Sequence, residues 1–350
     1  MRALRFHGRE DVRIDDIDEP EVRPGTVGVE VHANGLCGSD LHEYQGGPIF
    51  IPDDEPHPLT GETLPVVMGH EFAGEVYVVG DGVEGVERGD QVAIEPLLRD
   101  NDCDRCRRGA YNLCPQAGFH GLMGGGGGLS ERTVVPSYMV HQLPEGMSTE
   151  VGALAEPVAV GLHGVRQSGF RAGQRALVLG AGPIGLVTAM CLRASGAASV
   201  VVGEVAAARK DMAERLAADV VFDPTDVEAS EIAAEHTPDG FDVVYDAAGL
   251  PATFQAALES VKPQGTVSNL AIWEDPTEIQ PNDLVMAEAH LTGAIAYAGE
   301  YPAVLQMLHD GRIDPGPLIT GRVPLDDAVE GGFEELMNNK DEHVKLLVTP

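Results

Sequence analysis

Residues 175–192, "RALVLGAGPIGLVTAMCL", decide the fold class of this chain. A short apolar run leads into a turn with three glycines, and an apolar helical stretch follows. The glycines and a proline interrupt the run in its middle, so a strand, a turn and a helix describe it better than a membrane span does. In this context the pattern G-x-G-x-x-G predicts a loop that binds a dinucleotide. Its members are Gly180, Gly182, Pro183, Ile184 and Gly185.

Each glycine of this loop has its own task. Gly180 would permit the tight turn, Gly182 would let the backbone approach a pyrophosphate, and Gly185 would let the helix pack on the strand. Glu204 ends the next predicted strand, where an acidic side chain binds ribose hydroxyls and repels a 2′-phosphate. The sequence therefore favours NAD over NADP. Arg209 is the counter-argument, because an arginine can receive that phosphate; its other roles are to cover the adenine or to pair with a helix neighbour.

Outward from this loop, apolar runs alternate with alanine-rich helical stretches between residues 158 and 295. Such alternation predicts a parallel, doubly wound sheet of the Rossmann type. The expected strands are 175–180, 199–204, 219–222, 241–245, 265–271 and 290–295, and two of the expected helices are 206–218 and 251–261.

The parts on either side have a different pattern. Residues 1–155 are rich in glycine, proline and short β-like runs, which predicts a compact β-rich domain. The chain ends in the strand-like "HVKLLVTP", which we expect to pair with that first domain. The proline-rich segment 48–65 predicts a loop near the substrate cleft.

The charge of the chain is extreme. It has 56 acidic residues against 23 lysines and arginines, a net charge of −33, and only four lysines. This excludes nucleic acid as an expected partner. Self-repulsion should loosen the fold at low ionic strength, whereas a screening length of ~3 Å in molar salt should remove it. We expect a soluble cytoplasmic protein adapted to high salt, without a membrane partner; its N-terminus is too charged for a signal peptide.

A second stretch, "GLCGSDLHEY" at residues 35–44, places a thiol, a hydroxyl, a carboxylate and an imidazole close together. "VVMGHEFAGEV" adds His70 and Glu71, and "ALAEPVAVGLHGV" adds Glu156. Alone, each has an ordinary structural explanation. With Cys37 they form a donor set that suits a catalytic zinc, which takes three protein ligands and keeps a fourth position open.

Three of the remaining cysteines lie in "DNDCDRCRRGAYNLC". Their spacing is typical of a metal site rather than of a disulfide framework. A carboxylate stands where a fourth thiolate would complete the set, so this lobe is either a structural zinc site with one oxygen ligand or metal-free; we favour zinc. The candidate ligands are Asp100, Cys103, Cys106 and Cys114.

The chain resembles the zinc-dependent medium-chain dehydrogenase/reductase family over essentially its whole length. The residues that carry the resemblance are "GLCGSDLH", "MGHEFAGEV", "VERGDQVAIEP", the cysteine cluster with "GAYNLC", and "LGAGPIGL". Within it, "CGSDLHEYQGGPIFIP", "HPLTGETLPVVMGHE", "LTGAIAY" and "EHVKLLV" resemble the 2,3-butanediol dehydrogenase group. The resemblance implies a GroES-like catalytic domain of residues 1–157 and 296–350 around a Rossmann domain of residues 158–295.

The resemblance also implies roles for single residues. Cys37, His70 and Glu156 would hold the catalytic zinc, and Glu71 would be an additional or exchanging ligand. Ser39 would receive the alcohol proton and His42 would pass it to water through the cofactor ribose. We expect Asp40 to hold the loop.

The expected activity is hydride transfer between a small secondary alcohol or vicinal diol and NAD, in a homodimer or homotetramer. Two alternatives stay open. One is a polyol, sugar or L-threonine dehydrogenase of the same family. The other is a catalytically idle binding protein on this scaffold.

Overall fold

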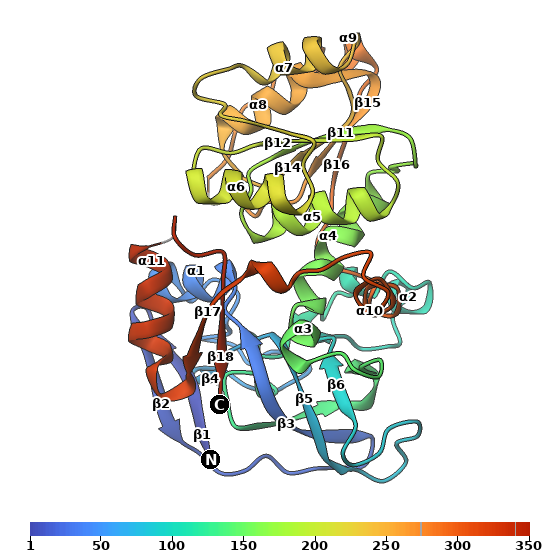
Figure 1. Cartoon of the computed structure of the whole chain (residues 1–350). Coiled ribbons are helices and arrows are strands. Elements are labelled where there is room, and N and C mark those ends of the chain that lie inside the picture. Colours follow the sequence, from blue (N-terminus) through green and yellow to red (C-terminus); the bar gives the residue numbers. More distant parts are fainter. Residues whose placement is uncertain (274, 340) are drawn as a thin grey trace. The chain divides into compact units, whose positions relative to one another are not determined.

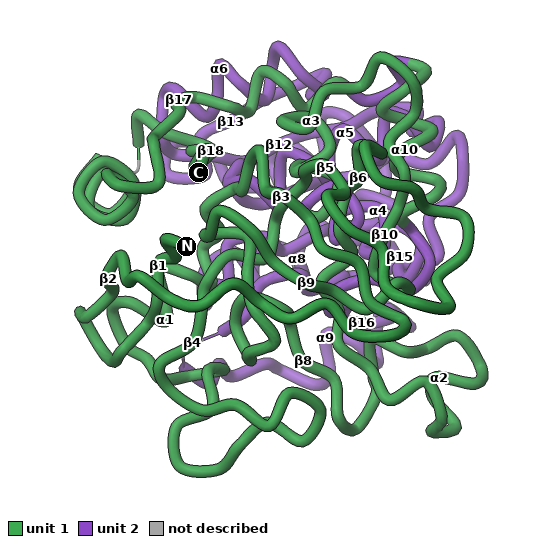
Figure 2. Tube along the Cα trace, turned by 90° about the horizontal axis from the view of Figure 1, so that it is seen from below, with its two compact units in different colours: residues 1–156, 301–310, 314–350 green, residues 157–300, 311–313 purple. Residues whose placement is uncertain are grey.

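The computed structural model describes residues 1–273, 275–339 and 341–350 (Figure 1). The chain divides into two compact units, coloured separately in Figure 2. Unit 1 comprises residues 1–156, 301–310 and 314–350, and unit 2 comprises residues 157–300 and 311–313. None of the helices in the described ranges is long and apolar enough to cross a membrane.

Unit 1 is built mostly on antiparallel strands, as its β-rich sequence predicts, and among its described strands only the last two pair in parallel. Its main sheet has the order β10-β6-β5-β3-β18-β17, and β9 also pairs with β3. A smaller sheet has the order β2-β1-β4, and β7 pairs with β8. The bounds are β1 (Arg2–Gly8), β2 (Asp11–Asp16), β3 (Thr26–Gly35), β4 (Val66–Val67), β5 (Glu71–Val79), β6 (Gln91–Ile94), β7 (Leu97–Leu98), β8 (Gly118–Phe119), β9 (Arg132–Pro136), β10 (Val140–Gln142), β17 (Ile319–Pro324) and β18 (Lys345–Thr349).

The C-terminal strand β18 joins this sheet between β17 and β3, which confirms the expected pairing of "HVKLLVTP" with the first domain. Val31 and Phe72 belong to one apolar core of the unit, and Leu36 and Phe333 belong to another. The helices of unit 1 are α1 (Gly38–Gly46), α2 (Asp104–Arg107), α3 (Thr149–Ala153), α10 (Tyr301–His309) and α11 (Glu335–Asn338).

Unit 2 has a parallel sheet in the order β13-β12-β11-β14-β15-β16. This is the order of a dinucleotide-binding fold, with the switch point beside β11. Each of the six predicted strands has a counterpart, although β15 begins four residues earlier than expected: β11 (Arg175–Leu179), β12 (Ser199–Gly203), β13 (Val220–Phe222), β14 (Phe241–Asp246), β15 (Val261–Asn269) and β16 (His290–Gly293).

Helices cover both faces of this sheet, α5 and α6 on one and α7, α8 and α9 on the other (Figure 1). Both faces are therefore covered, and the strands β11, β12 and β14 are mostly buried, whereas the edge strand β16 is largely exposed. The helices are α4 (Ala155–Gln167), α5 (Pro183–Ala194), α6 (Ala207–Leu216), α7 (Ala229–His236), α8 (Pro251–Ser260) and α9 (Pro281–Ala287). The α/β class and the Rossmann sheet beside a β-rich domain are confirmed.

Candidate functional site

Helix α1 presents the thiol of Cys37. Cys37 has extended backbone angles, φ −103° and ψ 156°, and immediately precedes the helix. Its N–H donates to the Asp40 carboxylate across 3.0 Å, so Asp40 fixes the turn into a helix rather than a loop. The thiol of Cys37 thus lies at the N-terminus of α1.

His70 and Glu71 reach the same place from the start of β5. Both are buried. They follow Gly69, whose φ of +94° few other residues adopt and whose missing Cβ leaves room for the side chain of Asn34. One ligand atom each from Cys37, His70 and Glu71 lies within 4.8 Å of the others.

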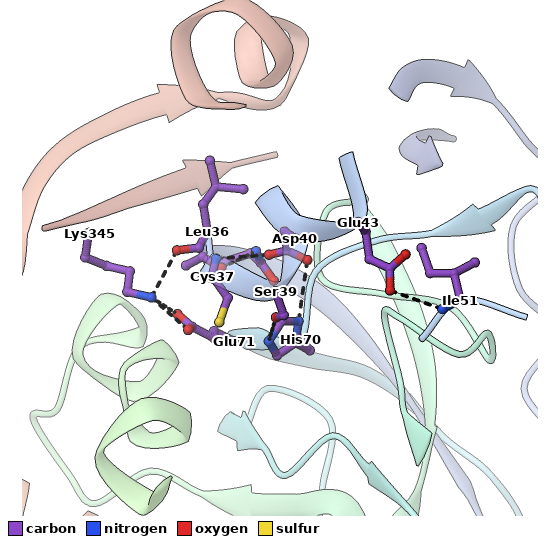
Figure 3. Close-up of polar contacts among 11 residues, drawn as sticks. Leu36, Cys37, Ser39, Asp40, Glu43, Ile51, His70, Glu71 and Lys345 are labelled. Carbon is purple, nitrogen blue, oxygen red and sulfur yellow. Dashed lines mark hydrogen bonds and ion pairs between the residues drawn. The ribbon is translucent and has the colours of Figure 1, made fainter. Parts of the chain in front are cut away.

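The imidazole of His70 lies between two polar groups. Its Nδ1 faces the buried carboxylate of Asp40 at 3.6 Å, and its Nε2 lies 3.3 Å from the hydroxyl of Ser39 (Figure 3). Burial alone would lower the pKa of His70, but Asp40 and Cys37 outweigh it and raise the pKa well above its usual value. The same negative field favours any cation at this point, and a carboxylate behind the ring is the usual support of a metal-binding histidine.

Lys345, the first residue of β18, also contacts this group of residues. Its ammonium lies 2.7 Å from both carboxylate oxygens of Glu71 and donates to the carbonyl of Leu36 at 3.0 Å (Figure 3). Burial would lower the pKa of Lys345, but the charges of Glu71 and Cys37 raise it. The sequence reasoning did not single out this lysine.

Two further residues predicted at this site have different positions. Glu156 is buried in the first turn of α4 and adds to the negative field on Lys345, but the described residues bring Glu71, not Glu156, into the group with Cys37 and His70. His42 lies one turn after Ser39 on α1 and is partly buried.

Glu43, also on α1 and unmentioned by the sequence reasoning, is fully buried. Its carboxylate accepts N–H bonds from Ile49, Phe50 and Ile51 at 2.9, 2.5 and 3.2 Å, so it holds the start of the predicted loop 48–65.

The cysteine lobe forms a second group. One ligand atom each from Asp100, Cys103, Cys106 and Cys114 lies within 4.8 Å of the others. The Asp100 carboxylate accepts N–H bonds from Cys103 and Asp102 at 2.9 Å each, which holds the pKa of Asp100 well below its usual range. Burial and the neighbouring Cys103, Asp100 and Cys114 raise the pKa of Cys106 to about 12.

The nucleotide loop in unit 2 has the expected form. Gly180 has a φ of +96°, Gly182 caps α5, and a Cβ at Gly185 would collide with the carbonyl of Gly180. Pro183 and Ile184 form the first turn of α5. The free N–H groups at this helix start suit a phosphate.

Glu204 lies beside this loop and is nearly buried. Its carboxylate accepts N–H bonds from Ala181, Val205 and Ala206 at 2.7, 2.8 and 2.9 Å. Glu204 thus ties the glycine loop to the end of β12, while Arg209 lies in the first turn of α6.

The donor sets fit zinc at both groups. Zinc binds thiolate, imidazole and carboxylate, and a set of three protein ligands is typical of catalytic sites whereas four are typical of structural ones. The group of Cys37, His70 and Glu71 has three donors and the lobe has four. Unit 1 therefore offers one site of each kind.

Comparisons with known proteins agree with this geometry. The family model "Alcohol dehydrogenase GroES-like domain" matches residues 23–145, and "Zinc-binding dehydrogenase" matches residues 183–310. The (R,R)-butanediol dehydrogenase of Bacillus subtilis (strain 168) is 46% identical over 352 residues, which cover 100% of both chains. The crystal structure of 2R,3R-butanediol dehydrogenase from Bacillus subtilis has a TM-score of 0.95 and 44% identity, and covers 100% of this chain and 99% of that one. Sorbitol dehydrogenase of Homo sapiens is 33% identical and covers 99% of this chain and 96% of that protein.

The relatives decide between the branches that the sequence motifs leave open. Identity is higher to the butanediol dehydrogenase than to the sorbitol dehydrogenase, and in each case nearly the whole of both chains is aligned. The family and its branch are thus confirmed: the chain belongs to the zinc-dependent medium-chain dehydrogenases, in the butanediol dehydrogenase-like branch.

Proposed function

We propose that this protein interconverts 2,3-butanediol and acetoin, with NAD as hydride acceptor and zinc held by Cys37, His70 and Glu71. One observation carries the proposal: a thiol, an imidazole and a carboxylate converge at one buried point of a chain that is 46% identical to an (R,R)-butanediol dehydrogenase. Zinc bound there would act as a Lewis acid that lowers the pKa of the substrate hydroxyl.

The chain's own residues would orient the substrate and move its proton. Ser39 lies 3.3 Å from His70 Nε2, so its hydroxyl is at the metal group and can accept the alcohol proton while donating its own. His42, one helical turn away, suits the exit of that proton because a neutral imidazole can accept a proton at one ring nitrogen and donate one from the other. Asp40 keeps the ring of His70 in place. Glu156 is a candidate for a further ligand or for the partner of the second diol oxygen.

The cofactor would bind unit 2. The N–H groups of α5 would receive the pyrophosphate, and Glu204 would receive the ribose hydroxyls by exchanging its bonds to backbone N–H groups for bonds to the sugar. A 2′-phosphate would meet the same carboxylate and be repelled. This supports NAD rather than NADP, with Arg209 against the adenosine.

We further propose that the lobe of Asp100, Cys103, Cys106 and Cys114 holds a structural zinc, and that the protein works in a salt-rich cytoplasm. The four donors of the lobe support the first point. The net charge of −33 supports the second.

A homo-oligomer is the expected assembly, and unit 2 offers a face for it. β16 is the edge strand of the parallel sheet, and its Leu291 is exposed, as are Val285 and Met286 of α9 and Ile295. An apolar sheet edge invites a second copy of the same strand. Light scattering after chromatography should give a dimer or tetramer that Leu291→Lys weakens; a wild-type monomer would contradict this.

A substrate panel tests the main proposal. Purified protein in molar potassium chloride would be assayed with NAD and the butanediol stereoisomers, and with sorbitol, glucose, L-threonine and ethanol. We expect the highest kcat/KM for the (R,R) diol, the substrate for which its relatives are named. A higher value for a hexose, polyol or L-threonine would move the protein to another branch.

A matched pair of cysteine variants tests the metal. Cys37→Ser should abolish turnover and release one zinc per chain. Cys191→Ser is the control, because Cys191 is a buried thiol in α5 whose pKa burial raises to about 12. It should keep turnover and metal content. Full turnover of a metal-free preparation would exclude the zinc mechanism, and no turnover on any alcohol in a zinc-loaded preparation would favour an idle binding protein.

A further inference from the structure

Lys345 is the exception among the lysines of this chain. Among the lysines that the structure describes, Lys210 and Lys262 have side chains 28% and 37% exposed, whereas that of Lys345 is 2% exposed. It comes from a strand 274 positions away from Glu71. A buried ammonium loses its hydration, and an apolar residue of similar size is often equally stabilising. Its presence beside the candidate metal group therefore calls for a functional reason.

The contacts of Lys345 hold its ammonium fully. An ammonium has three protons to donate. Here they have three acceptors: the two carboxylate oxygens of Glu71 at 2.7 Å each and the carbonyl of Leu36 at 3.0 Å (Figure 3). The nitrogen is thus held by one carboxylate and one backbone carbonyl.

The carboxylate of Glu71 is equally constrained. Each of its oxygens receives a bond from the ammonium, and it packs against Gly35, where a Cβ would collide with it and would also touch the Lys345 side chain at 3.3 Å. Gly35 therefore provides the space in which the pair forms. Glu71 offers a metal only the lone pairs that Lys345 leaves free.

We propose that Lys345 is a positioning residue that competes with the catalytic metal for Glu71. By sharing the carboxylate, it keeps Glu71 a weak, exchangeable ligand, so that a coordination position stays available to the substrate oxygen. This inference rests on the proposed zinc at Cys37 and His70. It assigns Lys345 no contact with the substrate.

A purely structural role predicts the opposite sign. If Lys345 only pinned Glu71 in place, then its loss would disorder the carboxylate and weaken metal binding. If Lys345 competes with the metal, its loss leaves the buried carboxylate of Glu71 without a partner. The metal then neutralises that charge, and metal binding becomes tighter. The sign of the change in metal affinity therefore separates the two roles.

The experiment measures zinc affinity rather than activity. Metal-stripped protein in molar potassium chloride would be titrated with zinc against a chromophoric chelator. The binding step that Cys37→Ser removes belongs to this site, which separates it from the cysteine lobe. For Lys345→Met, an uncharged side chain of similar length, we expect zinc to bind ~10-fold more tightly or better, the scale on which residues behind metal ligands act.

Two further readouts sharpen the test. With cobalt in place of zinc, the visible absorption reports the coordination number, and Lys345→Met should shift it toward the spectrum of a site with a permanent extra ligand. In the Glu71→Gln background the same lysine change should have a much smaller effect on affinity. Lys262→Met is the matched control, because Lys262 pairs with Asp242 in unit 2; it should leave metal affinity unchanged.

Each outcome has one meaning. Tighter zinc binding by Lys345→Met, with the altered cobalt spectrum, supports the proposal. Unchanged or weaker binding overturns it while leaving the zinc enzyme intact. If wild-type protein shows no Cys37-dependent binding step, the proposed metal site and this inference both fail. Should Lys345→Met not fold, Lys345→Gln replaces it, because an amide can still donate to Leu36 without bringing a charge.

Discussion

His120 should make the stability of this protein depend on pH in a window that its burial defines. The side chain is 1% exposed, its Nε2 lies 2.8 Å from the hydroxyl of Thr133, and its ring lies 5.8 Å from that of Phe72. Burial lowers the pKa of His120 from 6.5 to about 3. The folded protein therefore keeps this imidazole neutral at pH values where the unfolded chain protonates it.

The sign and size of the effect follow from linkage. Below pH 6.5 the unfolded state binds a proton that the folded state refuses, so stability is complete above that pH and is lost as the pH falls toward 3. One pH unit corresponds to about 1.4 kcal/mol, so at about pH 4.5 the loss from His120 is about 2.7 kcal/mol. At pH 7.5 it is negligible.

The assay is urea unfolding followed by circular dichroism, in molar potassium chloride and at fixed protein concentration, at pH 7.5 and 4.5. His120→Gln keeps a hydrogen-bonding group for Thr133 but cannot be protonated. We expect the variant to lose less stability than wild type between the two pH values, by about 2.7 kcal/mol. His309→Gln, at an exposed position, should behave as wild type. Equal pH dependence in wild type and His120→Gln would refute the reasoning.

Further predictions address the sites and the charge. Asp40→Asn should weaken zinc binding at the Cys37 group by roughly 10- to 100-fold, as measured by chelator competition, because His70 loses its anionic support; unchanged affinity would exclude that role. Steady-state kinetics should give a higher kcat/KM with NAD than with NADP, and Glu204→Ala should reduce the ratio of the two values. A wild-type preference for NADP would mean that attraction of the 2′-phosphate by Arg209 exceeds its repulsion by Glu204. Asp100→Ala should lower the zinc content by one per chain, whereas a metal-free lobe would show no change. The thermal midpoint should rise from low to molar potassium chloride, and a constant or falling midpoint would contradict salt adaptation.

Local patterns were enough to predict much of this molecule. The central strands β11, β12 and β14 of unit 2 contain apolar runs and the glycine loop is contiguous, so both can be recognised from short stretches of sequence. The candidate metal donors could also be predicted, because Cys37 lies in a short polar segment after β3 and the polar His70–Glu71 pair interrupts an apolar segment at the start of β5. Glu71 rather than Glu156 lies within the metal group, a distinction that depends on side-chain positions which spacing does not specify.

The residues that sequence reasoning missed depend on long-range packing. Lys345 has the appearance of an ordinary strand lysine, and its burial arises from the pairing of β18 with β3 and β17. A signal was available, because the three residues that follow it in the strand are apolar and the chain has only four lysines. Glu43 has no such signal in the sequence. The three N–H groups that donate to its carboxylate belong to residues 49–51, and only the path of the loop brings them to it.

The position of Lys345 in the chain has a consequence for the order of assembly. Cys37, His70 and Glu71 are separated by at most 34 residues, whereas the bond from Lys345 to Leu36 spans 309. Contacts between near neighbours form faster than those that close a long loop. During synthesis, we expect the three donors to meet while β18 is still in the ribosome, so that nascent chains capture zinc with the undivided charge of Glu71. The mature protein would then hold a metal acquired under tighter binding than its finished site provides.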